Sequence, residues 1–188
     1  PKSKSDLAFT MHMLAWLSTA GTAAIVEFPG VLYRGGAEQK IRKYLIDNNY
    51  VDTVIQLPAN LFFGVSIATC VIVLKKSKFE NKTLFIDASQ LFVHEGNKNK
   101  LSPENIEAIV SEYAEHKQVK HFSALVDNKV VAENGYNLSV SSYVEAEDTR
   151  PQTDIRELNE RIRRIVAHEN ELRTEIDAII AELEAETL

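Results

Sequence analysis

The chain has 188 residues, of which 45% are hydrophobic and 26% are charged, and it contains one cysteine. This composition excludes a disordered chain and a disulfide scaffold. The sequence contains no apolar run of eighteen residues and no recognisable signal peptide. It therefore gives no reason to expect a membrane span or an oxidising compartment. The net charge of −6 is uneven, with +3 on residues 1–80 and −9 on residues 81–188. Charge alone therefore gives no prediction of nucleic-acid binding.

Residues 5–80 alternate between helical and strand-like patterns. Met11, Leu14 and Leu17 are spaced like the buried face of a helix, which Gly21 is expected to end. A second amphipathic helix follows Gly35 and Gly36 and ends near residues 47–49. Apolar runs predict strands at 23–26, 51–57 and 70–74.

The order of these elements predicts an α/β sheet covered on both faces, since its strands are continuously apolar. The last two strands are joined by a connection too short for a helical crossover, which favours an antiparallel pair. Such a sheet resembles half of a domain, because the early strands that usually hold a Gly-rich turn are missing.

The next region, 81–150, is less regular. Leu84 to Ile86 reads as a strand, and Ser102 followed by Pro103 has the form of a helix N-cap with proline at the first helical position. A turn at 135–137 precedes an apolar stretch that runs to Val144.

The final region starts at Pro151, and a long helix is expected from about residue 154 to 187. Apolar residues recur there at alternating spacings of three and four, which is typical of a coiled-coil seam. Packing of the helix on its own core is the alternative. The seam consists of Ile155, Leu158, Ile162, Ile165, Leu172, Ile176, Ile179 and Leu183.

Motif searches find no catalytic constellation and no metal site. The five histidines lack metal-ligand spacing, and no Ser/His/Asp arrangement is readable. Gly35-Gly36 before a helix favours a flexible turn over a phosphate site, because no Gly-Lys-Ser/Thr follows. Cys70 lies within an apolar strand, as expected of a small buried residue and not of a nucleophile.

The loop 57–64 carries two aromatic residues, Phe62 and Phe63, between Pro58 and Gly64. Exposed aromatic rings on a loop between strands can stack on a flat ligand such as a nucleobase. The alternative is that both rings fill the core beneath the loop.

These residues carry a family resemblance. The stretch from Ile25 to Lys76, IVEFPGVLYRGGAEQKIRKYLIDNNYVDTVIQLPANLFFGVSIATCVIVLKK, closely resembles the modification subunit of type I restriction-modification systems. SDLAFTMHML before it, and LFIDASQLF and ENGYNLSVSSYV after it, support the resemblance over about residues 1–145. Members of this family are adenine-N6 DNA methyltransferases that use S-adenosylmethionine.

The resemblance implies a C-terminal fragment. The family motifs Asp-Pro-Ala-Ala-Gly-Ser-Gly and Asn-Pro-Pro-Tyr/Phe do not occur in this sequence and would lie before Pro1, so no catalytic residue is assigned here and the fragment alone is expected to be inactive.

The implied site residues follow the family pattern. Phe62 or Phe63 matches the aromatic residue that packs on the flipped target adenine, although Val65 and Ala68 depart from the pattern of this loop. Residues expected in the cleft or in DNA positioning are Tyr33, Arg34, Gly35, Gly36, Pro58 and Asn60.

The resemblance also implies partners: the specificity subunit, against which the C-terminal helices pack, a second modification subunit, the restriction subunit and double-stranded DNA. The protein is expected in the cytoplasm, and no membrane is expected among its partners.

The fold class expected is therefore α/β: the C-terminal half of a Rossmann-like methyltransferase sheet ending in an antiparallel strand pair, then a long coiled-coil-type helix. The expected regions are 1–80 for the methyltransferase half, 81–150 for a mixed α+β extension and 151–188 for subunit association.

The alternative function is a non-enzymatic coiled-coil module on an α/β platform. A stand-alone nucleotide-binding domain would need a Gly-rich phosphate loop, which is not found.

Overall fold

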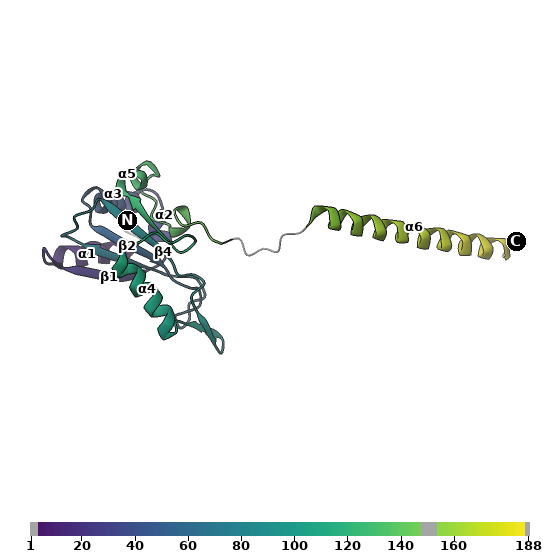
Figure 1. Cartoon of the computed structure of the whole chain (residues 1–188), viewed down its shortest axis with the longest axis horizontal. Coiled ribbons are helices and arrows are strands. Elements are labelled where there is room, and N and C mark those ends of the chain that lie inside the picture. The colour runs from purple at the N-terminus through teal and green to yellow at the C-terminus, as the bar shows by residue number, and fades with distance from the viewer. Residues whose placement is uncertain (1–3, 148–153, 187–188) are drawn as a thin grey trace. The chain divides into compact units, whose positions relative to one another are not determined.

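Helices and strands follow one another much as the sequence predicts (Figure 1). The computed structural model describes residues 4–147 and 154–186, so Pro1, Pro151 and Thr187, on which three of the expectations rest, lie outside the described residues. The elements are α1 (Asp6–Trp16), β1 (Thr22–Glu27), α2 (Gly30–Tyr33), α3 (Ala37–Asp47), β2 (Val51–Gln56), β3 (Cys70–Lys75), β4 (Lys82–Asp87), β5 (Val93–Glu95), β6 (Lys98–Lys100), α4 (Pro103–Glu115), β7 (Ser123–Asp127), α5 (Asn128–Glu133), the 3-10 helix η1 (Val140–Ser142) and α6 (Ile155–Glu186).

The main sheet has five strands in the order β1-β3-β2-β4-β7, and β5 and β6 form a separate hairpin. The predicted antiparallel pairing of β2 with β3 is confirmed. However, this pair does not end the sheet, because β3 lies between β2 and β1, and β1 pairs antiparallel with it at the edge. On the other side β4 is parallel to β2, and β7 is antiparallel to β4.

Both faces of the sheet are covered, as the continuously apolar strands predicted. Successive side chains of a strand point to opposite faces, so Val54 and Ile55 enter two different core clusters. The first cluster receives side chains from α1, α2, α3 and α5, among them Leu14 and Leu45. The second lies under α4, where Ile109 packs with strand residues such as Leu84 and Ile86.

A local signal sets the start of α4. The Ser102 hydroxyl accepts a hydrogen bond from the Asn105 amide over 3.2 Å, and Pro103 opens α4, as predicted. The first helix ends earlier than expected. Its last residue is Trp16, and Leu17 is already extended, so Gly21 belongs to the following turn instead of the helix end.

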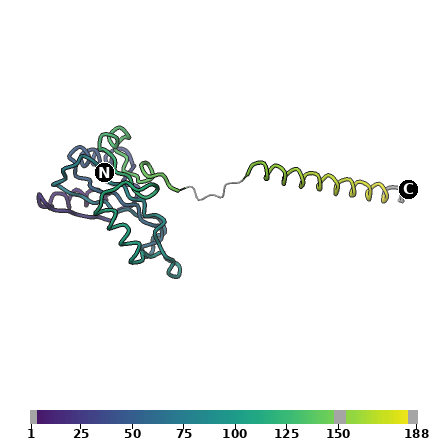
Figure 2. The backbone as a smooth tube through the Cα atoms, in the orientation of Figure 1, coloured from purple at the N-terminus to yellow at the C-terminus, as the bar shows by residue number. Residues whose placement is uncertain are grey.

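The expected boundary near residue 80 does not separate two bodies. β4 and β7 lie beyond it yet belong to the same sheet as β2, and one compact unit extends to Glu147. The second unit contains α6, which begins and ends close to the predicted positions and is unbroken (Figure 2). Every side chain described on α6 is exposed, including the eight residues of the seam. Pairing of this seam with another helix stays a prediction.

Within the described ranges, no helix combines the length and the apolar character that crossing a bilayer requires.

Candidate functional site

A hollow of about 220 Å³ lies where β1 ends and the connection between β2 and β3 folds back over the sheet. Apolar side chains form most of its wall, and carboxylate and hydroxyl groups are placed among them. Its lining residues are Asp6, Val26, Glu27, Phe28, Phe62, Val65 and Thr69. An apolar wall with a few polar groups is typical of sites that bind small flat ligands.

Two polar side chains of this hollow are buried. The Glu27 carboxylate accepts a hydrogen bond from the Thr10 hydroxyl over 3.0 Å, and burial raises the pKa of Glu27, with a smaller contribution in the same direction from Asp6. Thr69 is 5% exposed, and its Oγ1 has no hydrogen-bond partner among the described residues. A buried hydroxyl without a partner costs about 1–3 kcal/mol, so Thr69 gives this hollow a hydrogen-bonding group that is not used by the described residues.

The aromatic residues of the loop are not core residues. Phe63 is 98% exposed, and Phe62 is 42% exposed and lines the hollow together with Phe28. The alternative in which both rings fill the core is therefore wrong. Large apolar side chains left in contact with water next to a hollow commonly indicate a binding surface.

The other expected loop residues have structural roles. Pro58 is buried at the start of the loop. Asn60 adopts a left-handed conformation with φ of 62°, which asparagine tolerates better than most residues. Its side chain donates to the Asn97 carbonyl over 2.9 Å and accepts from Lys98 over 3.1 Å, which ties the loop to the β5–β6 hairpin.

The four expected cleft residues that follow β1 do not line the hollow. Tyr33 is exposed at the end of α2, and Arg34 pairs with Glu38 at 3.7 Å. Gly35 and Gly36 connect α2 to α3, and the φ of 70° at Gly36 explains the glycine there. Their expected role in DNA positioning stays a prediction.

The described residues offer little to a dinucleotide-type cofactor. The Gly35-Gly36 turn follows a helix and not a strand, so it lacks the strand–turn–helix context of a phosphate-binding loop. These residues therefore provide no phosphate-binding loop of that type for a nucleoside cofactor such as S-adenosylmethionine.

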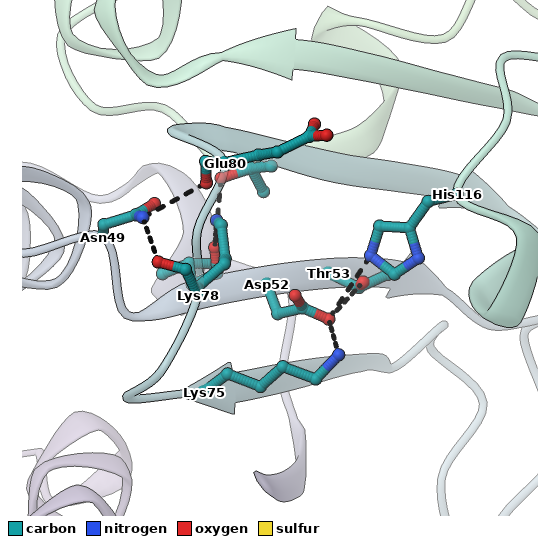
Figure 3. Close-up of polar contacts among 9 residues, drawn as sticks. Asn49, Asp52, Thr53, Lys75, Lys78, Glu80 and His116 are labelled. Atoms are coloured by element: carbon teal, nitrogen blue, oxygen red, sulfur yellow. Dashed lines mark hydrogen bonds and ion pairs between the residues drawn. The ribbon is translucent and has the colours of Figure 1, made fainter. Parts of the chain in front are cut away.

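A larger hollow, of about 550 Å³, lies at the opposite end of β2 and is rich in charges. Figure 3 shows Lys75 and His116 converging on Asp52, whose Oδ2 lies 3.2 Å from the Lys75 Nζ and 3.6 Å from the His116 Nε2. The Thr53 hydroxyl donates to the same oxygen over 3.2 Å. Asp52 is buried at an irregularity in the pairing of β2 with β3.

The neighbouring groups of this second hollow are also paired. Lys78 donates to the Val51 carbonyl, and burial lowers the pKa of Lys78 to about 8. The Asn49 amide donates to the carbonyls of Lys78 and Glu80 over 3.2 and 3.1 Å, which fixes the connection between β3 and β4 (Figure 3). These contacts explain the cluster as a structural network.

Two observations concern metal binding and nucleophilic chemistry. Across residues 4–147 and 154–186, no group of three or more histidine, cysteine or acidic side chains is placed to hold a metal ion. Cys70 is buried, its thiol donates to the Glu27 carbonyl, and burial raises its pKa to about 12. The thiolate needed for nucleophilic chemistry is therefore strongly disfavoured.

Comparison with known proteins identifies the class. A family model described as N-6 DNA Methylase matches residues 1–152. The chain belongs to the N-6 DNA methylase family, as its resemblance implied.

Within that family, the similar curated proteins are methylase subunits of type I restriction enzymes. The MpnII methylase subunit of Mycoplasma pneumoniae is 48% identical over 99% of this chain, and the MjaVII methylase subunit of Methanocaldococcus jannaschii is 35% identical over 94%. This chain spans 34% and 31% of their lengths, about a third.

Solved structures of type I restriction-modification methyltransferase subunits are also similar to this chain. The type I restriction-modification methyltransferase subunit of Streptococcus thermophilus shares 43% identity and superposes with a TM-score of 0.76, covering 77% of this chain and 31% of that chain. The EcoKI M protein, at 18% identity and a TM-score of 0.59 over 77% of this chain and 38% of that chain, shows the same fold.

Sequence reasoning missed two parts of the site. Thr69 and Glu27 gave no motif, because a threonine before a strand and a glutamate at the end of one are ordinary. The β5–β6 hairpin was also missed, because its polar sequence lacks apolar alternation.

Proposed function

We propose that this chain forms part of the DNA methyltransferase subunit of a type I restriction-modification system, which transfers the methyl group of S-adenosylmethionine to the N6 atom of adenine in DNA. The chain's part is one wall of the pocket that holds the target adenine after it leaves the duplex. The observation that carries this proposal is the hollow beside Phe62, which Phe28 and Thr69 also line; the buried hydroxyl of Thr69 has no partner in the described structure. A flipped base needs stacking surfaces and hydrogen-bonding groups at its edge.

The work of the chain is placement of the base. Phe62 or Phe63 stacks on the adenine, and the Thr69 hydroxyl and Glu27 carboxyl offer polar contacts at the edge of the ring. When bound, the cofactor supplies the electrophilic methyl group. We propose that the chain works within a longer subunit, in line with its share of the relatives' length, and that residues 1–188 alone do not methylate DNA. The reaction is proposed to take place in the cytoplasm, where the DNA substrate is found.

The double variant Phe62→Ala with Phe63→Ala in the full-length subunit tests the proposal. Both rings are substantially exposed, so their loss costs little folding energy. Stacking on an aromatic side chain contributes about 1–3 kcal/mol per base, so we expect methyl transfer to fall by about 10- to 100-fold while the affinity for S-adenosylmethionine is unchanged. Equal loss of methyl transfer and cofactor affinity would instead favour a structural role for both rings.

The exposed seam of α6 supports the second part of the proposal, that this helix binds the long helices of the specificity subunit. Charges at two seam positions, Ile162→Glu with Ile176→Glu, should abolish co-purification of the two subunits and leave the α/β unit folded. Ala167→Glu with Thr174→Glu adds the same charge on the other face of α6 and is the matched control. If the seam variant still binds, the helix is not the interface.

A further inference from the structure

The β5–β6 hairpin is hydrogen-bonded to the loop that carries Phe62. Asn60 donates to the Asn97 carbonyl over 2.9 Å and accepts from the Asn99 amide at its own carbonyl over 3.1 Å. The Asn99 side chain donates to the Ala59 carbonyl over 2.9 Å. The Lys98 ammonium donates to Asn60 Oδ1 over 3.1 Å and to the Phe62 carbonyl over 3.3 Å. Five hydrogen bonds therefore join three consecutive hairpin residues to residues 59–62.

These bonds act on a segment that has few other constraints. The connection from Leu57 to Thr69 contains no helix or strand, and it is longer than most connections in compact domains. Its two ends are joined by the bond from the Leu57 amide to the Thr69 carbonyl, but between them the described backbone bonds are few. Removal of the hairpin contacts would therefore release the backbone on which Phe62 is carried.

The hairpin contributes no side chain to either hydrophobic core cluster. None of its residues, from Val93 to Lys100, belongs to either core cluster, and the β5 residues are exposed. Lys98 and Lys100 also differ from each other. Lys98 is half-buried and reaches the loop, whereas Lys100 is exposed and pairs only with Glu95 at 3.2 Å in the described structure. The two lysines thus give a matched pair of variants on one hairpin.

We propose that the β5–β6 hairpin is a positioning element of the base site, and that Lys98 and Asn99 are positioning residues that hold Phe62 in place for the flipped adenine. This inference rests on the proposed function. The residues do not touch the reacting atoms and act through the backbone of residues 59–62. Displacements of about 1 Å in a positioning element can cost 100-fold in rate, so a hairpin outside the core still affects catalysis.

The experiment uses the full-length subunit with its specificity subunit and compares Lys98→Ala, Asn99→Ala and the control Lys100→Ala. Amide hydrogen exchange should be about tenfold faster at residues 59–62 in the first two variants and unchanged in the control. Methyl transfer should fall about tenfold through kcat, with the affinity for S-adenosylmethionine unchanged, and Lys98→Arg should restore most of it.

A double-mutant cycle tests whether Lys98 acts through Phe62. In a Phe62→Ala background, Lys98→Ala should lower methyl transfer by less than about twofold, because the ring it positions is already absent. Two independent losses that multiply, or unchanged exchange at residues 59–62, would overturn the inference. An inactive wild-type complex would refute the proposed function instead, and the exchange measurement would still decide the role of the hairpin.

Discussion

The two ends of the central sheet both present polar groups in a hollow, but they differ in how those groups are satisfied. At the end near Asp52, a buried carboxylate meets Lys75, His116 and Thr53, and the Lys78 ammonium has a carbonyl partner. At the end near Thr69, a buried hydroxyl has no described partner and aromatic rings face water.

This difference teaches that charge and volume are poor guides to function here. The larger and more charged hollow is the one whose groups are already paired, and paired groups have little capacity left for a ligand. The smaller hollow keeps unmet bonding capacity and exposed apolar surface, which a ligand can use.

The largest effect on stability is expected at Asp52. Asp52→Ala removes a buried carboxylate on which Lys75 and His116 converge, and breaking such a network costs about 3 kcal/mol. Denaturant unfolding of the chain measures the loss. The control is Asp47→Ala, whose pair with Lys43 is exposed, and it should leave the midpoint almost unchanged. Similar midpoints for the two variants would contradict a structural role for Asp52.

A smaller effect should follow pH at the same end. The pKa of Lys78 is about 8 in the folded chain, below its unfolded value of about 10.4. The unfolded state therefore binds more protons between these values, and the free energy of unfolding should rise with pH across this window. Relative to Lys78→Met, the wild type should gain on the order of 1–2 kcal/mol from pH 7 to 10.5, allowing for solvent screening. A flat difference would show that Lys78 is not buried as described.

The opposite sign is expected at the other end. The pKa of Glu27 is raised by burial, so the folded state holds its proton to higher pH than the unfolded state does. Stability should therefore fall as the pH rises from the ordinary glutamate value of about 4.3 through the raised value. Glu27→Gln still accepts from Thr10 and should lack this fall, so it should be at least as stable as the wild type at pH 7. A less stable glutamine variant at pH 7 would contradict the assigned cause.

The smallest effect is expected at Cys70, whose thiol donates to the carbonyl of Glu27, a lining residue of the candidate site. Because burial raises its pKa to about 12, a thiol reagent should label it only when the chain unfolds. Labelling rates in buffer and in denaturant measure this difference. Rapid labelling of the native chain would show that Cys70 is not buried as described.

Local patterns predicted α1, α3, α4, α6 and the strands β1 to β4, but not α2, α5, η1, β5, β6 and β7. The Ser102-Pro103 signal fixed the start of α4, and the apolar runs located β1, β2 and β3, because these features depend on neighbours in sequence. The strand order was not predictable in the same way. That β1 joins the sheet through β3 is a pairing between residues far apart in the chain, and no local pattern encodes it.

The same distinction between local and long-range features applies to the candidate site. The exposed aromatic loop was readable, because two phenylalanines beside Pro58 and Gly64 are unusual in a connection between strands. The hydrogen bonds from Lys98 and Asn99 to that loop join segments more than thirty residues apart in the chain, so no local pattern predicts them. The lack of a hydrogen-bond partner for the Thr69 hydroxyl in the described structure likewise depends on its three-dimensional surroundings.

We propose that the end of the sheet near Thr69, and not the end near Asp52, holds the target base. Phe79 offers a direct test, because it is fully exposed, like Phe63, but belongs to the connection between β3 and β4 at the other end. In the full-length complex, single-turnover methyl transfer should fall by about 10- to 100-fold in Phe62→Ala with Phe63→Ala and stay within twofold of wild type in Phe79→Ala. Equal losses in the two variants, or a loss confined to Phe79→Ala, would contradict the account.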